Sequence, residues 1–185
     1  MPLPQEIQTE RLLLRPPTEA DAQQMFKRYS SIPEVCRYLS WAPHRTVDDT
    51  IAYLRKSATD AGANPIERLL IFCRETGELL GSVGGPFEQH RVQFGYCLAR
   101  DAWGHGYATE AARAFVDTVM KDLTVWRIQA FCDVENRASA RVLEKAGLTL
   151  EATLKRYMMM PNVSDQPRDM FLFAKVREHF PDAIG

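Results

Sequence analysis

Two glycines between a predicted strand and a predicted helix form the chemically most informative part of this sequence. The segment from Gln93 to Glu110 reads QFGYCLARDAWGHGYATE and holds Gly104 and Gly106 in its turn. Such a turn lets backbone N–H groups converge on one point, and the dipole of the following helix adds positive potential there. Glycine suits both positions because a Cβ would hinder close backbone approach or a positive φ. The arrangement suits an anion, most often a phosphate, although two spaced glycines also occur in simple turns.

Two familiar phosphate-binding motifs do not fit this segment. The Walker pattern GxxxxGK[ST] is absent from the chain. A Rossmann GxGxx[GA] fingerprint would need glycine or alanine where Thr109 stands, and it would have to follow the first strand of a βαβ unit. The sequence therefore argues against a dinucleotide site.

Polar and sulfur-bearing side chains elsewhere give weaker signals. Asn136 and Ser139 stand three residues apart at the start of a predicted helix, a spacing that an asparagine N-cap explains without any chemistry. The cysteines lie far apart: Cys36, Cys73, Cys97 and Cys132. They form neither CxxC pairs nor a metal-spaced set, so we expect reduced thiols and no metal site.

Hydrophobic patterning predicts the elements that must position these residues. The predicted strands span residues 9–16, 66–74, 78–84, 91–98, 126–133, 148–157 and 168–176. Two long helices are expected over residues 107–123 and 136–146, the second closed by Gly147. Helices, an antiparallel meander and a strand–helix–strand unit around one sheet predict an α+β domain.

Three further helices are expected from the capping-box spacing, in which an acidic residue follows Ser or Thr by three positions. The pairs are Thr18 with Asp21, Ser31 with Glu34, and Thr46 with Asp49. The apolar positions assigned to these helices are Ala22, Met25, Phe26 and Tyr29, then Val35, Tyr38 and Leu39, then Val47, Ile51, Leu54 and Ala58. Gly62 is the expected stop of the third helix.

Composition sets limits on the class of protein. The chain has 185 residues, 45% hydrophobic and 25% charged, which suffices for one core, and we expect a single domain over residues 1–185. A net charge of −1 argues against a general nucleic-acid or membrane-surface binder. The chain holds no apolar run of spanning length, and Glu6 and Glu10 stand where a signal peptide would be apolar. We therefore expect a cytoplasmic protein, monomeric or homodimeric, with neither nucleic acid nor membrane as a partner.

The segment from Trp103 to Ala108 resembles the acetyl-CoA pyrophosphate loop of the GNAT acetyltransferases, of general form Q/R-x-x-G-x-G/A. Trp in place of Gln or Arg, followed by Gly-x-Gly-x-Ala-Thr-Glu, is usual in the branch similar to the ribosomal-protein N-terminal acetyltransferases. Three more segments resemble that branch in the same order: TERLLLR at 9–15, the Asn-x-x-Ser helix ending in Leu-Glu-Lys-Ala-Gly at 136–147, and RDMF at 168–171.

The resemblance implies a mostly antiparallel mixed sheet of about seven strands, splayed between strands four and five and flanked by helices. It also implies transfer of an acetyl group from acetyl-CoA to a primary amine, by direct attack in a ternary complex. The cofactor-binding residues that it implies are Tyr96, Cys97, Leu98, Trp103, Gly104, His105, Gly106, Tyr107, Ala108, Thr109, Asn136 and Ser139.

The resemblance also assigns roles within this set. N–H groups from Gly104 to Thr109 would hold the pyrophosphate, and the backbone of residues 96–98 would pair with pantetheine. An N–H of that strand, for which we name Cys97, would stabilise the tetrahedral oxyanion. Asn136 would bond the pantetheine arm, and Ser139 would position or protonate the departing thiolate. Other branches often carry a Tyr acid at the position of Leu143.

The general base is missing from its usual place. Many members of this branch have Glu two residues before the Gly-Tyr pair, where this chain has Gln93; Glu88, His90 and Asp133 are substitutes. Neutralising a lysine amine at pH 7 costs roughly 4–5 kcal/mol, but an α-amine costs only about 1–1.4 kcal/mol. We therefore expect a protein or peptide N-terminal α-amine as the acceptor.

Several alternatives stay open at this point. The acceptor could be a small amine such as a polyamine, an amino acid or an aminoglycoside. The chain could also be a non-catalytic module that binds acyl-CoA. Trp41, His44 and Met158-Met159-Met160 could line the acceptor pocket or simply pack, whereas packing is favoured for Trp126.

Overall fold

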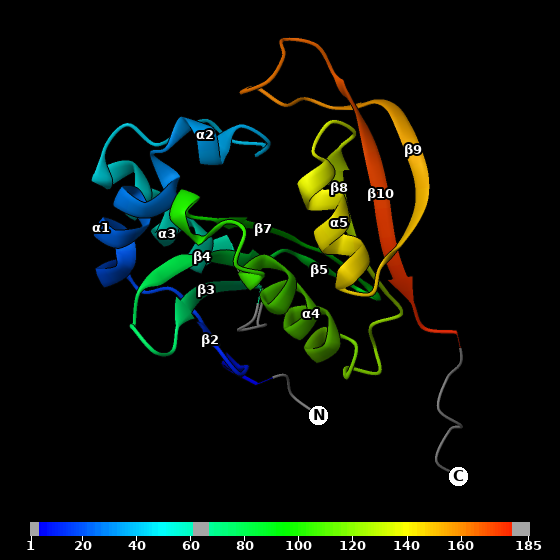
Figure 1. Ribbon diagram of the computed structural model, residues 1–185, viewed down its shortest axis with the longest axis horizontal. Helices are drawn as coiled ribbons and strands as arrows, with labels where there is room; N and C mark the ends of the chain where they lie inside the picture. The colour runs from blue at the N-terminus through cyan, green and yellow to red at the C-terminus, as the bar shows by residue number, and fades with distance from the viewer. Residues whose placement is uncertain (1–3, 61–66, 179–185) are drawn as a thin grey trace.

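The computed structural model describes residues 4–60 and 67–178, in which the strands form two five-stranded sheets (Figure 1). The first sheet has the order β1 (Ile7–Gln8), β2 (Leu12–Arg15), β3 (Arg68–Cys73), β4 (Leu79–Gly84) and β7 (Gly95–Leu98). The second has the order β5 (Phe87–Glu88), β6 (Arg91–Gln93), β8 (Arg127–Asp133), β10 (Arg168–Val176) and β9 (Thr149–Met158).

The two sheets separate within the segment that the sequence predicts as one strand over residues 91–98. That prediction is wrong in detail, because β6 pairs parallel with β8 while β7 pairs antiparallel with β4. Phe94 stands between them, 3% exposed, with its ring 5.5 Å from that of Phe115. The buried ring stands where the two strands diverge. The separation into two sheets confirms the expected splay of the sheet, and it leaves β7 at the edge of the first sheet.

Helices cover both faces of the first sheet (Figure 1). A helical segment on one face comprises Glu19–Asp21, α1 (Ala22–Met25) and a π-helical turn at Phe26–Ser30, followed by α2 (Pro33–Cys36) and α3 (Val47–Asp60). These helices pack their apolar side chains against those of β3 and β4 in one buried cluster. On the other face, α4 (Tyr107–Val119) and α5 (Arg137–Lys145) enclose the larger core between both sheets. No described helix is long and apolar enough to cross a membrane.

Two of the three capping pairs are confirmed. The backbone N–H of Thr18 donates to Asp21 at 2.7 Å, and that of Thr46 donates to Asp49 at 2.9 Å. The Ser31–Glu34 pair is wrong, because the Ser31 hydroxyl donates to a helical carbonyl and Glu34 pairs with Arg100.

Helix ends account for the other corrections. Because α2 ends at Cys36, Tyr38 and Leu39 lie beyond it, in the segment that leads to α3. The helix predicted over residues 107–123 ends at Val119. The expected stop at Gly62 falls outside the described residues.

Candidate active site

One cavity of about 1110 Å³ collects nearly all of the predicted site residues. Its walls come from β7, the loop before α4, the start of α5 and the segment after α2. Every predicted cofactor-binding residue lines it except His105. Residues that are distant in sequence therefore meet around a single space, large enough for an extended ligand.

The glycine loop has the geometry that its sequence predicts. Gly104 and Gly106 have φ angles of +81° and +80°, which L residues rarely adopt. Gly106 is the N-cap of α4, and no side chain caps the helix there. A Cβ on Gly104 would meet nothing within 4 Å among the described residues. The first N–H groups of α4, with no side-chain cap and open space at Gly104, thus suit a phosphate.

The acidic residue in the first turn of α4 bonds to the start of the chain. Glu110 accepts hydrogen bonds from the Thr9 hydroxyl at 2.6 Å and from the backbone N–H of Arg11 at 3.0 Å. Burial opposes its ionisation, but these bonds and the Arg11 guanidinium outweigh it, so its pKa lies below the usual value. Arg11 also donates to the carbonyl of His105 at 3.0 Å, which ties the loop to the start of the chain.

Strand β7 offers an open edge beside the glycine loop. Residues 96–98 face β4 on one side, and on the other side no described strand pairs with them. The indole N–H of Trp103 donates to the carbonyl of Leu98 at 2.9 Å and so fixes the loop against the end of the strand. An extended amide-bearing chain can bind to such an edge as an additional strand.

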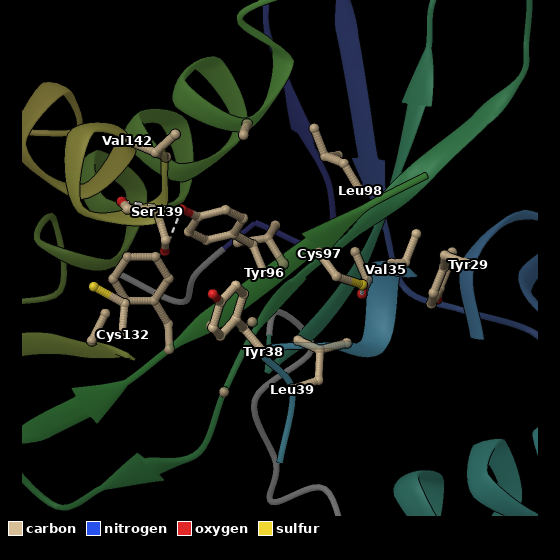
Figure 2. A pocket seen from close by; sticks show the side chains of 18 of the residues that line it. Tyr29, Val35, Tyr38, Leu39, Tyr96, Cys97, Leu98, Cys132, Ser139 and Val142 are labelled. Carbon is tan, nitrogen blue, oxygen red and sulfur yellow. Dashed lines mark hydrogen bonds between the residues drawn. The ribbon is translucent and has the colours of Figure 1, made fainter. Parts of the chain in front are cut away.

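A pair of hydroxyl groups lies where β7 and α5 approach each other. The Tyr96 hydroxyl lies 2.8 Å from Oγ of Ser139, as the dashed line in Figure 2 shows. Asn136 caps α5 by accepting the backbone N–H of Ser139 at 3.1 Å. Burial raises the pKa of Tyr96, so its phenol stays protonated and can donate.

The two thiols at this site are poor nucleophiles. Burial raises the pKa of Cys97 to about 11, and Cys97 Sγ lies 3.4 Å from the Ser82 hydroxyl. Burial likewise raises the pKa of Cys132 to about 11. Because the thiolate is the reactive form, both side chains stay inert near neutral pH, and Cys97 can take part only through its backbone.

Sequence reasoning missed two tyrosine side chains. It assigned Tyr96 only a backbone role, although alternation along β7 places Tyr96 and Leu98 against the core of α4 and α5 and Cys97 against the other cluster. Tyr38 points into the same cavity from the segment after α2 (Figure 2). Nothing in its spacing shows this, because it depends on α2 ending early.

None of the substitute bases lines the cavity, although Gln93 does. Glu88 pairs with Arg91 at 2.6 Å, and His90 is exposed. Asp133 is 1% exposed and accepts from Arg168. Burial opposes ionisation of Asp133, but the bonds from Arg168 outweigh it and keep its pKa below the usual value.

The remaining wall carries the aromatic and methionine residues whose role the sequence left open. Trp41, His44, Met158 and Met160 line the cavity, whereas Met159 and Trp126 do not. This wall includes the segment between α2 and α3, and a residue far along the chain holds its conformation.

The holding residue is Asn162, between β9 and β10. Its side-chain amide donates to the carbonyls of Cys36 and Trp41, each at 2.8 Å, and of Leu39 at 3.3 Å. Residue spacing carries no signal for this contact, which joins residues more than 120 positions apart.

Comparisons with known proteins agree with this geometry. Residues 11–149 match the Acetyltransferase (GNAT) domain family. The uncharacterized N-acetyltransferase p20 of Bacillus licheniformis is 30% identical over 178 residues, covering 93% of this chain and 96% of that protein. A GNAT-family acetyltransferase from Bacillus anthracis has a TM-score of 0.80 and 26% identity, covering 94% of this chain and 99% of that one.

A further solved structure shares the fold. It is a ribosomal L7/L12 α-N-protein acetyltransferase in complex with coenzyme A, with a TM-score of 0.79 at 19% identity, covering 92% of this chain and 97% of that one. The family match spans the glycine loop, the open strand edge and the start of α5. The chain belongs to the GNAT family and is an acetyl-CoA-dependent N-acetyltransferase.

Proposed function

We propose that this enzyme acetylates the N-terminal α-amine of a protein or peptide. The N–H groups at the start of α4 hold the pyrophosphate of acetyl-CoA, and the open edge of β7 binds the pantetheine arm. Asn136 bonds that arm, and the backbone N–H of Cys97 stabilises negative charge on the acetyl oxygen. These assignments rest on the residues that share the cavity.

The observation that supports an α-amine is the state of the carboxylates that line the cavity. Among the described residues these are Glu34, Glu67 and Glu135. Glu34 pairs with Arg100 at 2.8 Å, Glu135 with Arg168 at 2.9 Å, and Glu67 also has an interaction partner. The oxygens of Glu34 and Glu135 are therefore engaged by arginine side chains instead of being directed at an acceptor amine.

The same pairing argues against a polyamine acceptor. A spermidine N-acetyltransferase from Vibrio cholerae, solved with CoA and spermine, shares this fold with a TM-score of 0.75 at 17% identity, covering 91% of this chain and 96% of that one. A polycation requires several uncompensated negative charges, and the carboxylates of this cavity already have partners. An α-amine also loses its proton at a cost of only about 1–1.4 kcal/mol at pH 7, against roughly 4–5 kcal/mol for lysine.

Departure of the thiolate is served by the hydroxyl pair. The Ser139 hydroxyl positions and protonates the leaving sulfur, and Tyr96, at 2.8 Å, donates to Ser139 in turn. The phenol is suited to this task because burial favours its protonated form.

A thiol-release assay with acetyl-CoA tests the acceptor. Two peptides of one sequence are compared, one with a free N-terminus and no lysine, the other with a blocked N-terminus and one internal lysine, alongside spermidine. We expect the free N-terminus to give the highest kcat/KM. Equal or faster reaction of the lysine peptide or of spermidine would refute an α-amine acceptor, and tight CoA binding without thiol release on any amine would indicate a non-catalytic module.

A further inference from the structure

We propose that His44 receives the proton that the acceptor amine must lose. The inference deepens the proposed function and rests on it, since it names the general base that Gln93 does not supply. His44 lines the same cavity as Cys97 and Ser139 but reaches it from the segment between α2 and α3. It therefore reaches the cavity from a different part of the chain than the cofactor loop.

Hydrogen bonds fix the imidazole ring of His44. Its Nδ1 lies 2.8 Å from the hydroxyl of Thr50, and its backbone N–H donates to the carbonyl of Ser30 at 2.8 Å. The hydroxyls of Thr50 and Ser30 are 3.2 Å apart, and these residues are 0% and 1% exposed. A fully buried polar chain that ends on a ring at the cavity wall gives the imidazole one orientation.

The Thr50 contact also bears on which ring nitrogen of His44 can accept a proton. In the tautomer in which Nδ1–H donates to the Thr50 hydroxyl, Nε2 carries no proton and is the nitrogen that can accept one. When Nε2 takes a proton, Nδ1–H goes on donating to Thr50, whose hydroxyl can donate to Ser30 in turn. The chain thus accommodates both protonation states of His44.

The surroundings of His44 keep the ring neutral at pH 7. Burial lowers its pKa below the usual value, and the nearby charge of Asp49 opposes this only in part. The Tyr53 ring lies 5.8 Å from the imidazole, with the Arg68 guanidinium 5.2 Å from the centroid of Tyr53. A neutral imidazole can take a proton near pH 7.

Other groups that line the cavity do not suit this role. Among the described lining residues, His44 is the one imidazole. Glu34 and Glu135 are ion-paired, and the cysteines hold their protons because burial raises their pKa values.

The proton balance of the reaction is complete with this assignment. As the C–N bond forms and the C–S bond breaks, the acceptor ammonium loses two protons. One ends on the sulfur of CoA, and the other passes through His44 to solvent. Because a protonated His44 cannot accept, activity should fall only below the pKa of His44, where the free enzyme becomes protonated.

The test compares His44→Asn with the wild-type enzyme on the free-N-terminus peptide from pH 5.5 to 9. Asparagine keeps a polar group near Thr50 but cannot take the proton. We expect wild-type kcat/KM to stay level down to about pH 6.5, whereas that of the variant should fall about ten-fold per pH unit below about pH 8, where the neutral amine becomes scarce. The Kd for CoA and the Tm should be unchanged.

The exposed His90 provides a matched control, because His90→Gln should keep the wild-type profile. The proposal would be overturned if kcat/KM of His44→Asn depended on pH as that of the wild-type enzyme does. It would also be overturned if His90→Gln shifted the pH at which kcat/KM begins to fall. Failure of the proposed function looks different, since the wild-type enzyme would then not acetylate the peptide at any pH.

Discussion

The side-chain oxygens of Tyr96 and Ser139 lie 2.8 Å apart across the gap between the two sheets. Tyr96 belongs to β7, the edge of the first sheet, and Ser139 to α5, which packs on the second. Strands β7 and β8 belong to different sheets, so no backbone ladder joins the two sheets here. The contact between β7 and α5 bridges them through side chains. It sets the position of the Ser139 hydroxyl relative to the open edge of β7 (Figure 2).

The first prediction concerns this pair. Tyr96→Phe removes one oxygen and should lower kcat about ten-fold, because a hydrogen bond of roughly 1–1.5 kcal/mol that orients Ser139 is lost. Ser139→Ala should lower kcat at least as much, and the double variant should lose little more, since the residues act together. Steady-state kinetics measure kcat, which should fall more than the affinity for CoA.

A suitable control is Tyr157→Phe. Because Tyr157 is 52% exposed, this substitution should leave kcat unchanged. Full additivity of the Tyr96 and Ser139 effects would show that the hydroxyls act separately. An unchanged kcat in Ser139→Ala would remove that residue from the mechanism.

The second prediction concerns the glycine loop. Gly106→Glu should weaken CoA binding on the order of a hundred-fold, because a carboxylate would stand at the N-terminus of α4 where a diphosphate binds. Gly77→Glu is the matched control, since Gly77 has a φ of +70° and a Cβ there would meet nothing within 4 Å among the described residues. Both variants should lose about 1–2 kcal/mol of folding free energy from the positive φ.

Isothermal titration with CoA separates binding from this shared backbone cost. Equal CoA affinities in the two variants would contradict the assignment of the loop to the pyrophosphate.

The third prediction concerns Asn162. Asn162→Ala should raise the KM for the acceptor several-fold without changing the Kd for CoA, because its amide holds the wall that carries Trp41. Asn162→Asp should be worse, since it brings carboxylate oxygens toward three carbonyl groups. A KM that stays constant in both variants would show that this wall does not contact the acceptor.

Much of the site could be predicted from the sequence because it depends on local rules. Positive φ at Gly104 and Gly106 and the N-cap at Asn136 are properties of a few neighbouring residues. The orientation of Glu110 is different, because it depends on Thr9, 101 positions away in the chain.

The rest required tertiary information. Residues 91–98 read as one strand, and only the burial of Phe94 against Phe115 shows why they divide between sheets. Ser31 bonds back to the preceding helical turn instead of capping α2, which starts at Pro33 and ends at Cys36, so that Tyr38 lies beyond the helix. Competing local bonds of this kind are not visible in residue spacing.

The last prediction concerns acid stability and the ion pair between Asp133 and Arg168. The Asp133 side chain is fully buried, and its carboxylate lies 2.8 Å from Nε of Arg168. The backbone carbonyl of Asp133 accepts the N–H of Asn136. The pKa of Asp133 is lower in the folded than in the unfolded protein. Its contribution to the free energy of unfolding is therefore fully present above the unfolded-state pKa near 3.9 and is lost as the pH falls through the folded-state pKa. Asp133→Asn should cost about 3–5 kcal/mol at pH 7.

The pH dependence distinguishes this pair from a general loss of stability. Between pH 5 and pH 2 the unfolding free energy of Asp133→Asn should fall less steeply than that of the wild-type enzyme, by up to about 1.4 kcal/mol per pH unit for the missing proton. Urea titrations at each pH measure this slope. Asp117→Asn, at an exposed pair with Lys175, should keep the wild-type slope, because such pairs contribute little. Parallel curves for wild type and Asp133→Asn would mean that Arg168 anchors the start of α5 without help from the charge of Asp133.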